Sequence, residues 1–170
     1  MTLRFQGVIA GQGALVLRCA EEWLSRGHGL AAVISDDPAI ASWAAQKGLL
    51  VLPGQPAVVP GPSVDCDYIF LIGYPEEQLR NQPIRPRRGR IAYQDSLLPA
   101  YAGWHATSWA LWHRESVHGI TWFHPDAAGP QPLQQVEIQV APDETAFTLN
   151  AKCFDAALPA FARMLDDLEH

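Results

Sequence analysis

The stretch LRFQGVIAGQGALVLRCAEEWLSRGHGLAAVI, residues 3–34, carries the pattern that decides the fold. β-forming residues alternate over residues 3–10, a glycine turn ends the run, and apolar residues return at helical spacing over residues 14–26. A second apolar strand is expected over residues 30–34. A strand, a tight turn, a helix and a strand in this order predict a parallel β-α-β unit with a right-handed crossover.

The same alternation continues along the chain. Residues 68–72 are almost continuously apolar, which is typical of a strand that is buried on both faces. The proline-rich residues 53–63 are expected to form a surface connection. The sequence therefore predicts an α/β fold with a Rossmann-like, mostly parallel sheet and helices on both faces. The remaining expected strands are 50–52, 91–93, 119–123 and 136–140; the helices are 38–47, 76–81, 106–112 and 146–167, the last as one helix or as a pair broken at Pro159.

Length and charge limit the classes of protein that fit. The 170 residues suit one domain, expected over residues 1–167, and Leu168-Glu169-His170 is interpreted as the start of a purification tag. Twelve basic against 18 acidic side chains give a net charge of −6, which disfavours nucleic acid as a partner. No apolar run is long enough to cross a membrane, and the three cysteines have no metal-binding spacing. We expect a cytoplasmic protein without a metal.

The glycine turn leaves a second interpretation open. Gly11 and Gly13 match two of the three glycines of a dinucleotide-binding turn, and Asp36 stands where an acid would bind the ribose. The same glycines also suit any tight strand-to-helix turn, and Asp36 and Asp37 suit the cap of a helix that begins at Pro38. A nicotinamide cofactor therefore stays an alternative.

A second stretch, IAYQDSLLPAYAG at residues 91–103, followed by WHATSWAL at residues 104–111, carries a resemblance. It resembles the folate-dependent formyltransferases, the superfamily of methionyl-tRNA and glycinamide ribonucleotide formyltransferases, and it is most similar to formylation domains of nonribosomal peptide synthetases. The resemblance implies the catalytic-domain fold of that superfamily. It also implies a place for 10-formyltetrahydrofolate beside the strand that ends at Tyr93, with Leu98, Pro99 and Tyr101 as candidate contacts.

The sequence departs from that family where the chemistry would occur. Family members carry an Asn-x-His pair at the strand end, and here the pair is Ala92 and Gln94. The loop after Trp122 is short and lacks the family's Asp-x-Gly-Asp. Alanine donates no hydrogen bond and a glutamine amide does not titrate near neutral pH, so both catalytic roles are lost. We therefore expect a catalytically degenerate domain, a pseudoenzyme that needs no cofactor and serves a structural or docking role.

The alternative is an active one-carbon enzyme, such as a formyltransferase, that uses substitute groups. Asp95, His105 and His124 are the candidates, because a carboxyl and two imidazoles near the strand end could move a proton. If the ancestral pocket survives, 10-formyltetrahydrofolate is the expected cofactor.

Arginines between residues 80 and 90 form the last feature. They alternate with prolines, and we expect an exposed basic loop in which Arg85, Arg87 and Arg88 contact a carrier protein or a neighbouring synthetase domain. The six tryptophans are expected mostly to pack in the core, so no interface is predicted from them.

Overall fold

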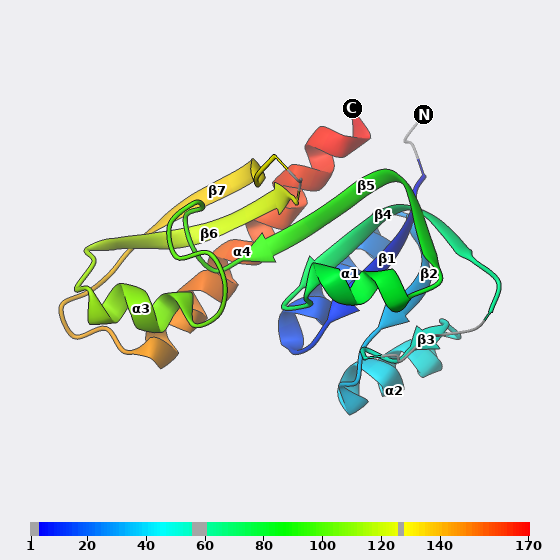
Figure 1. Cartoon of the computed structure of the whole chain (residues 1–170), viewed down its shortest axis with the longest axis horizontal. Coiled ribbons are helices and arrows are strands. Elements are labelled where there is room, and N and C mark those ends of the chain that lie inside the picture. The colour runs from blue at the N-terminus through cyan, green and yellow to red at the C-terminus, as the bar shows by residue number, and fades with distance from the viewer. Residues whose placement is uncertain (1–3, 56–60, 126–127) are drawn as a thin grey trace. The chain divides into compact units, whose positions relative to one another are not determined.

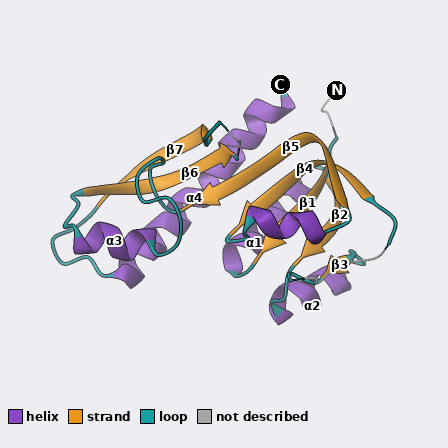
Figure 2. Ribbon diagram, viewed as in Figure 1, coloured by secondary structure: helices purple, strands orange, loops and turns teal. Residues whose placement is uncertain are grey.

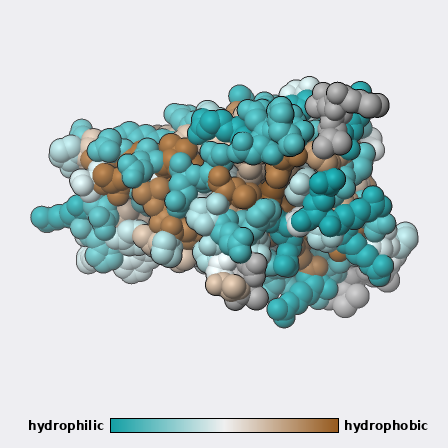
Figure 3. Space-filling model, turned by 90° about the horizontal axis from the view of Figure 1, so that it is seen from above, coloured by the Kyte–Doolittle hydropathy of each residue, from teal (hydrophilic) through white to brown (hydrophobic). Residues whose placement is uncertain are grey.

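The computed structural model describes residues 4–55, 61–125 and 128–170. The chain forms two compact units, residues 1–91 and residues 92–170. Strand β5 (Ile84–Gln94) supplies residues to both units. The elements of each unit are labelled in Figure 1, and Figure 2 shows strands and helices in both. The visible face carries mostly hydrophilic side chains with apolar ones between them (Figure 3).

The first unit contains the predicted β-α-β-α-β pattern. Its strands follow the order β3-β2-β1-β4-β5, and the β1–β2, β2–β3 and β1–β4 pairs are parallel. The fold class predicted from the sequence, Rossmann-like α/β, is confirmed. The elements are β1 (Gln6–Gly11), α1 (Ala14–Ser25), β2 (Gly29–Ile34), α2 (Pro38–Gln46), β3 (Val51–Leu52), β4 (Val64–Ile72) and the 3-10 helix η1 (Glu76–Asn81).

Trp23 fixes helix α1 on this sheet. Its ring lies 5.0 Å from that of Phe70, and its indole N–H donates to the carbonyl of Gly29 at 2.7 Å. A Cβ on Gly7 of strand β1 would lie only 3.0 Å from the Trp23 ring, so the absence of a side chain there lets the ring approach the strand closely. The buried indole thus has both packing and a hydrogen-bond partner.

The second unit combines an antiparallel sheet with a long helix. Its strand order is β5-β6-β7, and both strand pairs are antiparallel. Helix α4 lies against β6 and β7, where the fully buried Trp122 packs 5.0 Å from Phe161 and donates to the carbonyl of Ala157 at 3.0 Å (Figure 1). Of the two alternatives for residues 146–167, the single helix is confirmed. The elements are α3 (Ala106–Trp112), β6 (Val117–His124), β7 (Gln131–Gln139) and α4 (Ala146–Glu169).

One segment expected as a loop is a strand. Strand β5 begins at Ile84, so the predicted basic loop is wrong, and Arg85, Arg87 and Arg88 lie on a strand. Strand β6 pairs with β5 at residues 92–94, beyond Pro86, so a proline is tolerated there because no strand on that side needs its N–H. Of the helices in the described residues, none has both the length and the apolar character that spanning a membrane requires.

Helix α4 begins at a capping box with a charged neighbour. The Thr145 hydroxyl accepts from the N–H of Thr148, and the Thr148 hydroxyl accepts from the N–H of Thr145. Glu144 forms an ion pair with Lys152 and accepts from the N–H of Ala141. The bond from Lys152, with smaller contributions from Thr148 and Ala141, lowers the pKa of Glu144 from 4.5 to about 2.

Because the folded pKa of Glu144 is lowered, its charge stabilises the fold at neutral pH, and this stabilisation is lost as pH falls from 4.5 towards about 2. We expect Glu144→Gln to lower the melting temperature at pH 7 and to converge with the parent protein in acid. Thermal unfolding followed by circular dichroism at several pH values tests this. The exposed Glu137→Gln is the matched control, and an equal melting-temperature difference at every pH would contradict the prediction.

Candidate functional site

The end of strand β5 is where the sequence places the degenerate site. Ala92 and Gln94 both pair with strand β6, opposite Phe123 and Thr121. Ala92 is buried, and its methyl group can neither donate nor accept a hydrogen bond. The first of the two positions therefore contributes packing and no polar group.

The Gln94 side chain holds a neighbouring loop. Its amide nitrogen donates to the carbonyl of Gly103 at 2.8 Å and approaches the Tyr101 carbonyl at 3.4 Å and the Asp95 carboxylate at 3.3 Å. An amide nitrogen has two hydrogens, so these three acceptors occupy its donor capacity. Gln94 thus acts within the protein as a clamp on residues 101–103.

Asp95 lies next to this clamp. Burial raises the pKa of its carboxyl, while the nearby His118 and His105 oppose the shift. His118 is buried, and burial lowers its pKa; its Nε2–H donates to the Asp95 carbonyl at 2.8 Å, since a carbonyl only accepts. His118, which the sequence did not single out as a site residue, is therefore the imidazole that contacts the Asp95 backbone.

The two histidines named from the sequence lie in different places. His105 has a left-handed backbone with φ 62° just before helix α3, and its charge acts on Asp95. His124 ends strand β6, six residues beyond His118, or about 20 Å along an extended strand. Only His105 is thus placed near Asp95. Asp126, an acid in the short loop after Trp122, lies outside the described residues. Among the described residues no cluster of three or more metal-ligating side chains is present.

The segment Ser96–Pro99 is held by hydrogen bonds from the buried Thr121 on strand β6 and the exposed Gln135 on strand β7. The Thr121 hydroxyl donates to the Ser96 carbonyl at 2.7 Å and accepts from the N–H of Leu98 at 3.1 Å. Gln135 donates to the Leu98 carbonyl and to the Thr121 hydroxyl, both at 3.0 Å. The Leu98-Pro99 peptide bond is cis. These bonds fix the backbone of Ser96 and Leu98.

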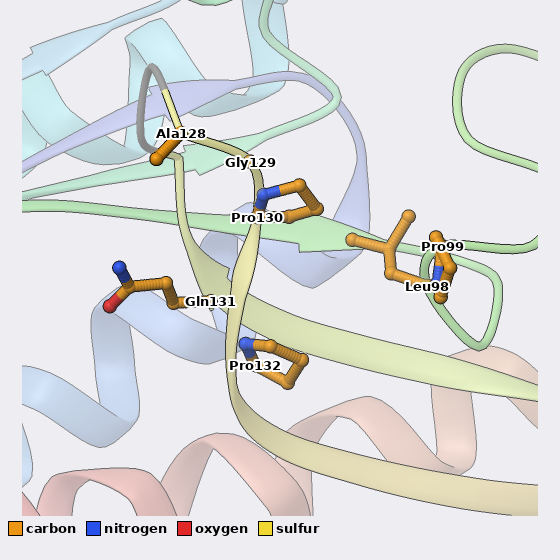
Figure 4. Close-up of a pocket in the computed structure, with 7 residues that line it drawn as sticks. All are labelled: Leu98, Pro99, Ala128, Gly129, Pro130, Gln131 and Pro132. Carbon is orange, nitrogen blue, oxygen red and sulfur yellow. The ribbon is translucent and has the colours of Figure 1, made fainter.

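A pocket of about 400 Å³ opens beside this segment (Figure 4). Apart from Gln131, the side chains that line it are apolar, and Gln131 extends away from Leu98 and Pro99 (Figure 4). Tyr101 does not line it; its hydroxyl donates to Glu115 at 2.7 Å. A pterin edge carries several donors and acceptors that need partners when buried, and the side chains of this lining other than Gln131 supply none. The lining residues are Leu98, Pro99, Ala128, Gly129, Pro130, Gln131 and Pro132.

The glycine turn of the first unit is held by caps. Asp37 accepts from the N–H of Ala39 at 2.9 Å and from the N–H of Gly13 at 3.1 Å, and these bonds lower its pKa. Asp36 accepts from the N–H of Gly54 at 2.8 Å. Both carboxylates are thus engaged by the backbone, but only Asp37 caps the helix that begins at Pro38, so the capping interpretation is confirmed for Asp37 and wrong for Asp36. This geometry disfavours the dinucleotide alternative.

Two of the candidate arginines of strand β5 are paired within their own unit. Arg87 lies 3.4 Å from Asp65, and Arg88 lies 3.9 Å from Asp67 and over the ring of Phe5 at 4.9 Å. All of these pairs are at least partly exposed, where an ion pair contributes little to stability. Arg85, Arg87 and Arg88 are exposed, and their role in partner binding stays a prediction.

Three tryptophans are exposed, so the expectation that most of them pack in the core is wrong for half of the six. Trp104, Trp109 and Trp112 are 68%, 51% and 79% exposed. The spacing of residues along helix α3 could have predicted this exposure. Ala106 and Ala110 are four residues apart and both buried, so Trp109 and Trp112 lie on a side of the helix that is turned away from the core of their unit.

Comparison with known proteins gives the family. The family model described as formyl transferase matches residues 64–165, more than half of the chain. Cytosolic 10-formyltetrahydrofolate dehydrogenase of Mus musculus is 41% identical over 66 residues, 38% of this chain and 7% of that protein. Methionyl-tRNA formyltransferase of Thermosynechococcus vestitus is 39% identical over 95 residues, 53% of this chain and 28% of that protein. The matches thus span less than a third of these curated relatives.

Solved structures agree on the fold. Phosphoribosylglycinamide formyltransferase from Brucella melitensis superposes with a TM-score of 0.75 at 21% identity, covering 98% of this chain and 96% of that one. A formyltetrahydrofolate deformylase from Pseudomonas syringae gives a TM-score of 0.71 at 17% identity, covering 96% and 60%. At such identities the likeness establishes architecture alone. Together with the family model, it leads to one conclusion: the chain belongs to the formyl transferase family.

Proposed function

We propose that this domain does not transfer formyl groups and that it serves as a folded binding domain, a pseudoenzyme of its family. The observation that carries the proposal is the Gln94 amide, which lies 2.8 Å from the Gly103 carbonyl and is occupied in holding a loop. The group at the end of strand β5 is thus engaged by the protein itself.

The chemistry of formyl transfer supports this proposal. The formyl oxygen becomes an oxyanion as the attacking amine adds, and the amine must lose a proton. Ala92 offers no donor to that oxygen, and Gln94 has no proton to exchange near neutral pH. Loss of an oxyanion donor costs about 10²–10³-fold in rate, and loss of an acid-base group about 10²–10⁴-fold. Both losses together reduce transfer to near the uncatalysed rate.

One observation favours a second candidate function, an active one-carbon enzyme with a substitute group. Asp95 is mostly buried beside Gln94, and its raised pKa keeps more of its carboxyl protonated than in water. Such a carboxyl could exchange a proton with a substrate amine. In this alternative 10-formyltetrahydrofolate is the formyl donor and Asp95 is the residue on which activity depends.

The binding role extends the expectation drawn from the sequence. A carrier protein or neighbouring domain of a peptide synthetase is the partner class we propose for the exposed arginines of strand β5. Arg87 and Arg88 already pair with Asp65 and Asp67, so an acidic partner would have to compete with these exposed pairs. A cytoplasmic location remains part of the same proposal.

Incubation of the purified protein with 10-formyltetrahydrofolate, with and without amine acceptors, tests the loss of activity. We expect tetrahydrofolate to appear at the rate seen in buffer, because no positioned group assists the reaction. Calorimetry with a stable formyltetrahydrofolate should detect no binding in the micromolar range, since the pocket lining does not match a pterin.

Two variants make this experiment decisive. If the parent protein exceeds the buffer rate by about tenfold or more and Asp95→Asn removes the excess, the pseudoenzyme proposal is overturned and the second candidate stands. Asn keeps the oxygen that accepts from Gln94, so the fold is preserved. Gln94→Ala is the matched control, which should release the loop at residues 101–103 without creating activity.

A further inference from the structure

Large aromatic side chains are exposed together on the second unit. Trp104, Trp109 and Trp112 are joined by Phe147, which is 83% exposed. Trp109 and Trp112 are three residues apart on helix α3 and so share one face of it, and Phe147 stands in the first turn of helix α4, which contacts α3. We refer to these four residues as the aromatic face.

Exposure of this kind needs a physical reason. Soluble monomers rarely expose several large aromatic side chains on neighbouring elements, and large exposed apolar patches mark interaction sites. Tryptophan is also the residue type most enriched among those that dominate binding energy in interfaces. The aromatic face lies on helices α3 and α4 and on Trp104 just before α3, and none of its four residues lines the apolar pocket beside Pro99.

The aromatic face is held in a fixed shape. The Tyr101 hydroxyl donates to Glu115 at 2.7 Å and lies 3.2 Å from Nδ1 of His113, the residue that ends helix α3. The Trp109 ring stacks on the His113 ring with centroids 6.2 Å apart. These contacts order the end of the helix before any partner arrives, which reduces the entropy lost on binding.

The area and the charge of the aromatic face together indicate what binds to it. A fully buried Trp or Phe removes about 150–250 Å² from water, so the aromatic face offers roughly 400–700 Å². Two such faces in contact would bury about 1,000 Å², the smallest area typical of a specific dimer. The residues that follow Trp112 are His113, Arg114 and Glu115, which carry both signs of charge and can pair across a twofold axis. A partner of one charge would instead call for a patch of the opposite sign.

We propose that the aromatic face binds the same face of a second copy of this chain, forming a twofold symmetric dimer. The contact is isologous, so each copy buries its own indoles against those of the other and no free face is left to extend the assembly. Dimer formation needs no folate and no catalytic group, so this proposal is tested independently of the function proposed above.

Sedimentation velocity of the full chain, from about 1 μM to several hundred μM, tests this proposal. We expect a monomer–dimer equilibrium that stops at the dimer and changes little with salt, because the contact is largely apolar. Trp112→Ser and Phe147→Ser should each weaken association by about tenfold or more, as expected for central aromatic residues in an interface. Both side chains are exposed, so the circular dichroism spectrum should stay unchanged.

Leu50→Ser supplies the matched control, because Leu50 is 48% exposed on the first unit and should leave association unaltered. Quenching of tryptophan fluorescence by acrylamide should fall as the parent protein dimerises and stay constant in Phe147→Ser, which keeps all six tryptophans. A monomer at every concentration, a dimer that both aromatic variants leave intact, or growth beyond the dimer would each overturn the proposal. Binding of the aromatic face only to a different protein would do the same.

Discussion

Gly119→Ala is expected to destabilise residues 92–170 strongly. A Cβ at Gly119 on strand β6 would lie 2.2 Å from the carbonyl oxygen of Val136 on strand β7 and 2.5 Å from the Leu97 side chain. Side-chain carbons essentially never approach backbone oxygen that closely, so β6 and β7 would have to separate and Leu97 would be displaced. We expect a cost of about 3 kcal/mol or more.

Thermal unfolding measured by circular dichroism tests this expectation, with insoluble expression as the extreme outcome. A loss of 3 kcal/mol corresponds to about 6–12 °C in melting temperature for a chain of this size. Gly61→Ala is the matched control, because nothing lies within 4 Å of the added carbon, and it should shift stability by less than about 0.5 kcal/mol. A melting temperature for Gly119→Ala within 2 °C of the parent would contradict the packing described above.

Thr121→Val should cause the second-largest loss. Valine has almost the shape of threonine, so packing is kept while the fully buried hydroxyl is removed. The Ser96 carbonyl and the N–H of Leu98 then lose a partner, and Gln135 loses one of its two acceptors. A buried polar group left without a partner costs about 1–3 kcal/mol, so we expect a total of about 3 kcal/mol.

Thr121→Ser separates the hydroxyl from the methyl group. Serine keeps the hydrogen bonds and removes one carbon, which should cost only about 1 kcal/mol. Urea unfolding of both variants gives the two free energies of unfolding. A larger loss for Thr121→Ser than for Thr121→Val would show that packing, and not the polar network, holds residues 96–99.

Sequence patterns that span only a few residues were enough to predict most of the helices and strands. Helix α3 was predicted at its observed bounds, and helix α2 begins at Pro38 with Asp37 as its cap, because caps and helical spacing depend on residues within a few positions of each other. The extent of strand β5 could not be obtained in this way. Its arginines and Pro86 look like a loop, and only hydrogen bonding with the neighbouring strand β4 makes them a strand.

At the candidate site, too, some properties followed from the sequence and others only from the structure. The sequence by itself determined that Ala92 supplies no hydrogen bond and that Gln94 does not titrate, since these are properties of the residue types. Only the tertiary structure decided that the Gln94 amide is occupied by the Gly103 carbonyl, nine residues away, and that three tryptophans lie on the surface. Chemical capacity is carried by each side chain, whereas its use depends on which distant atoms the fold brings within a few ångströms of it.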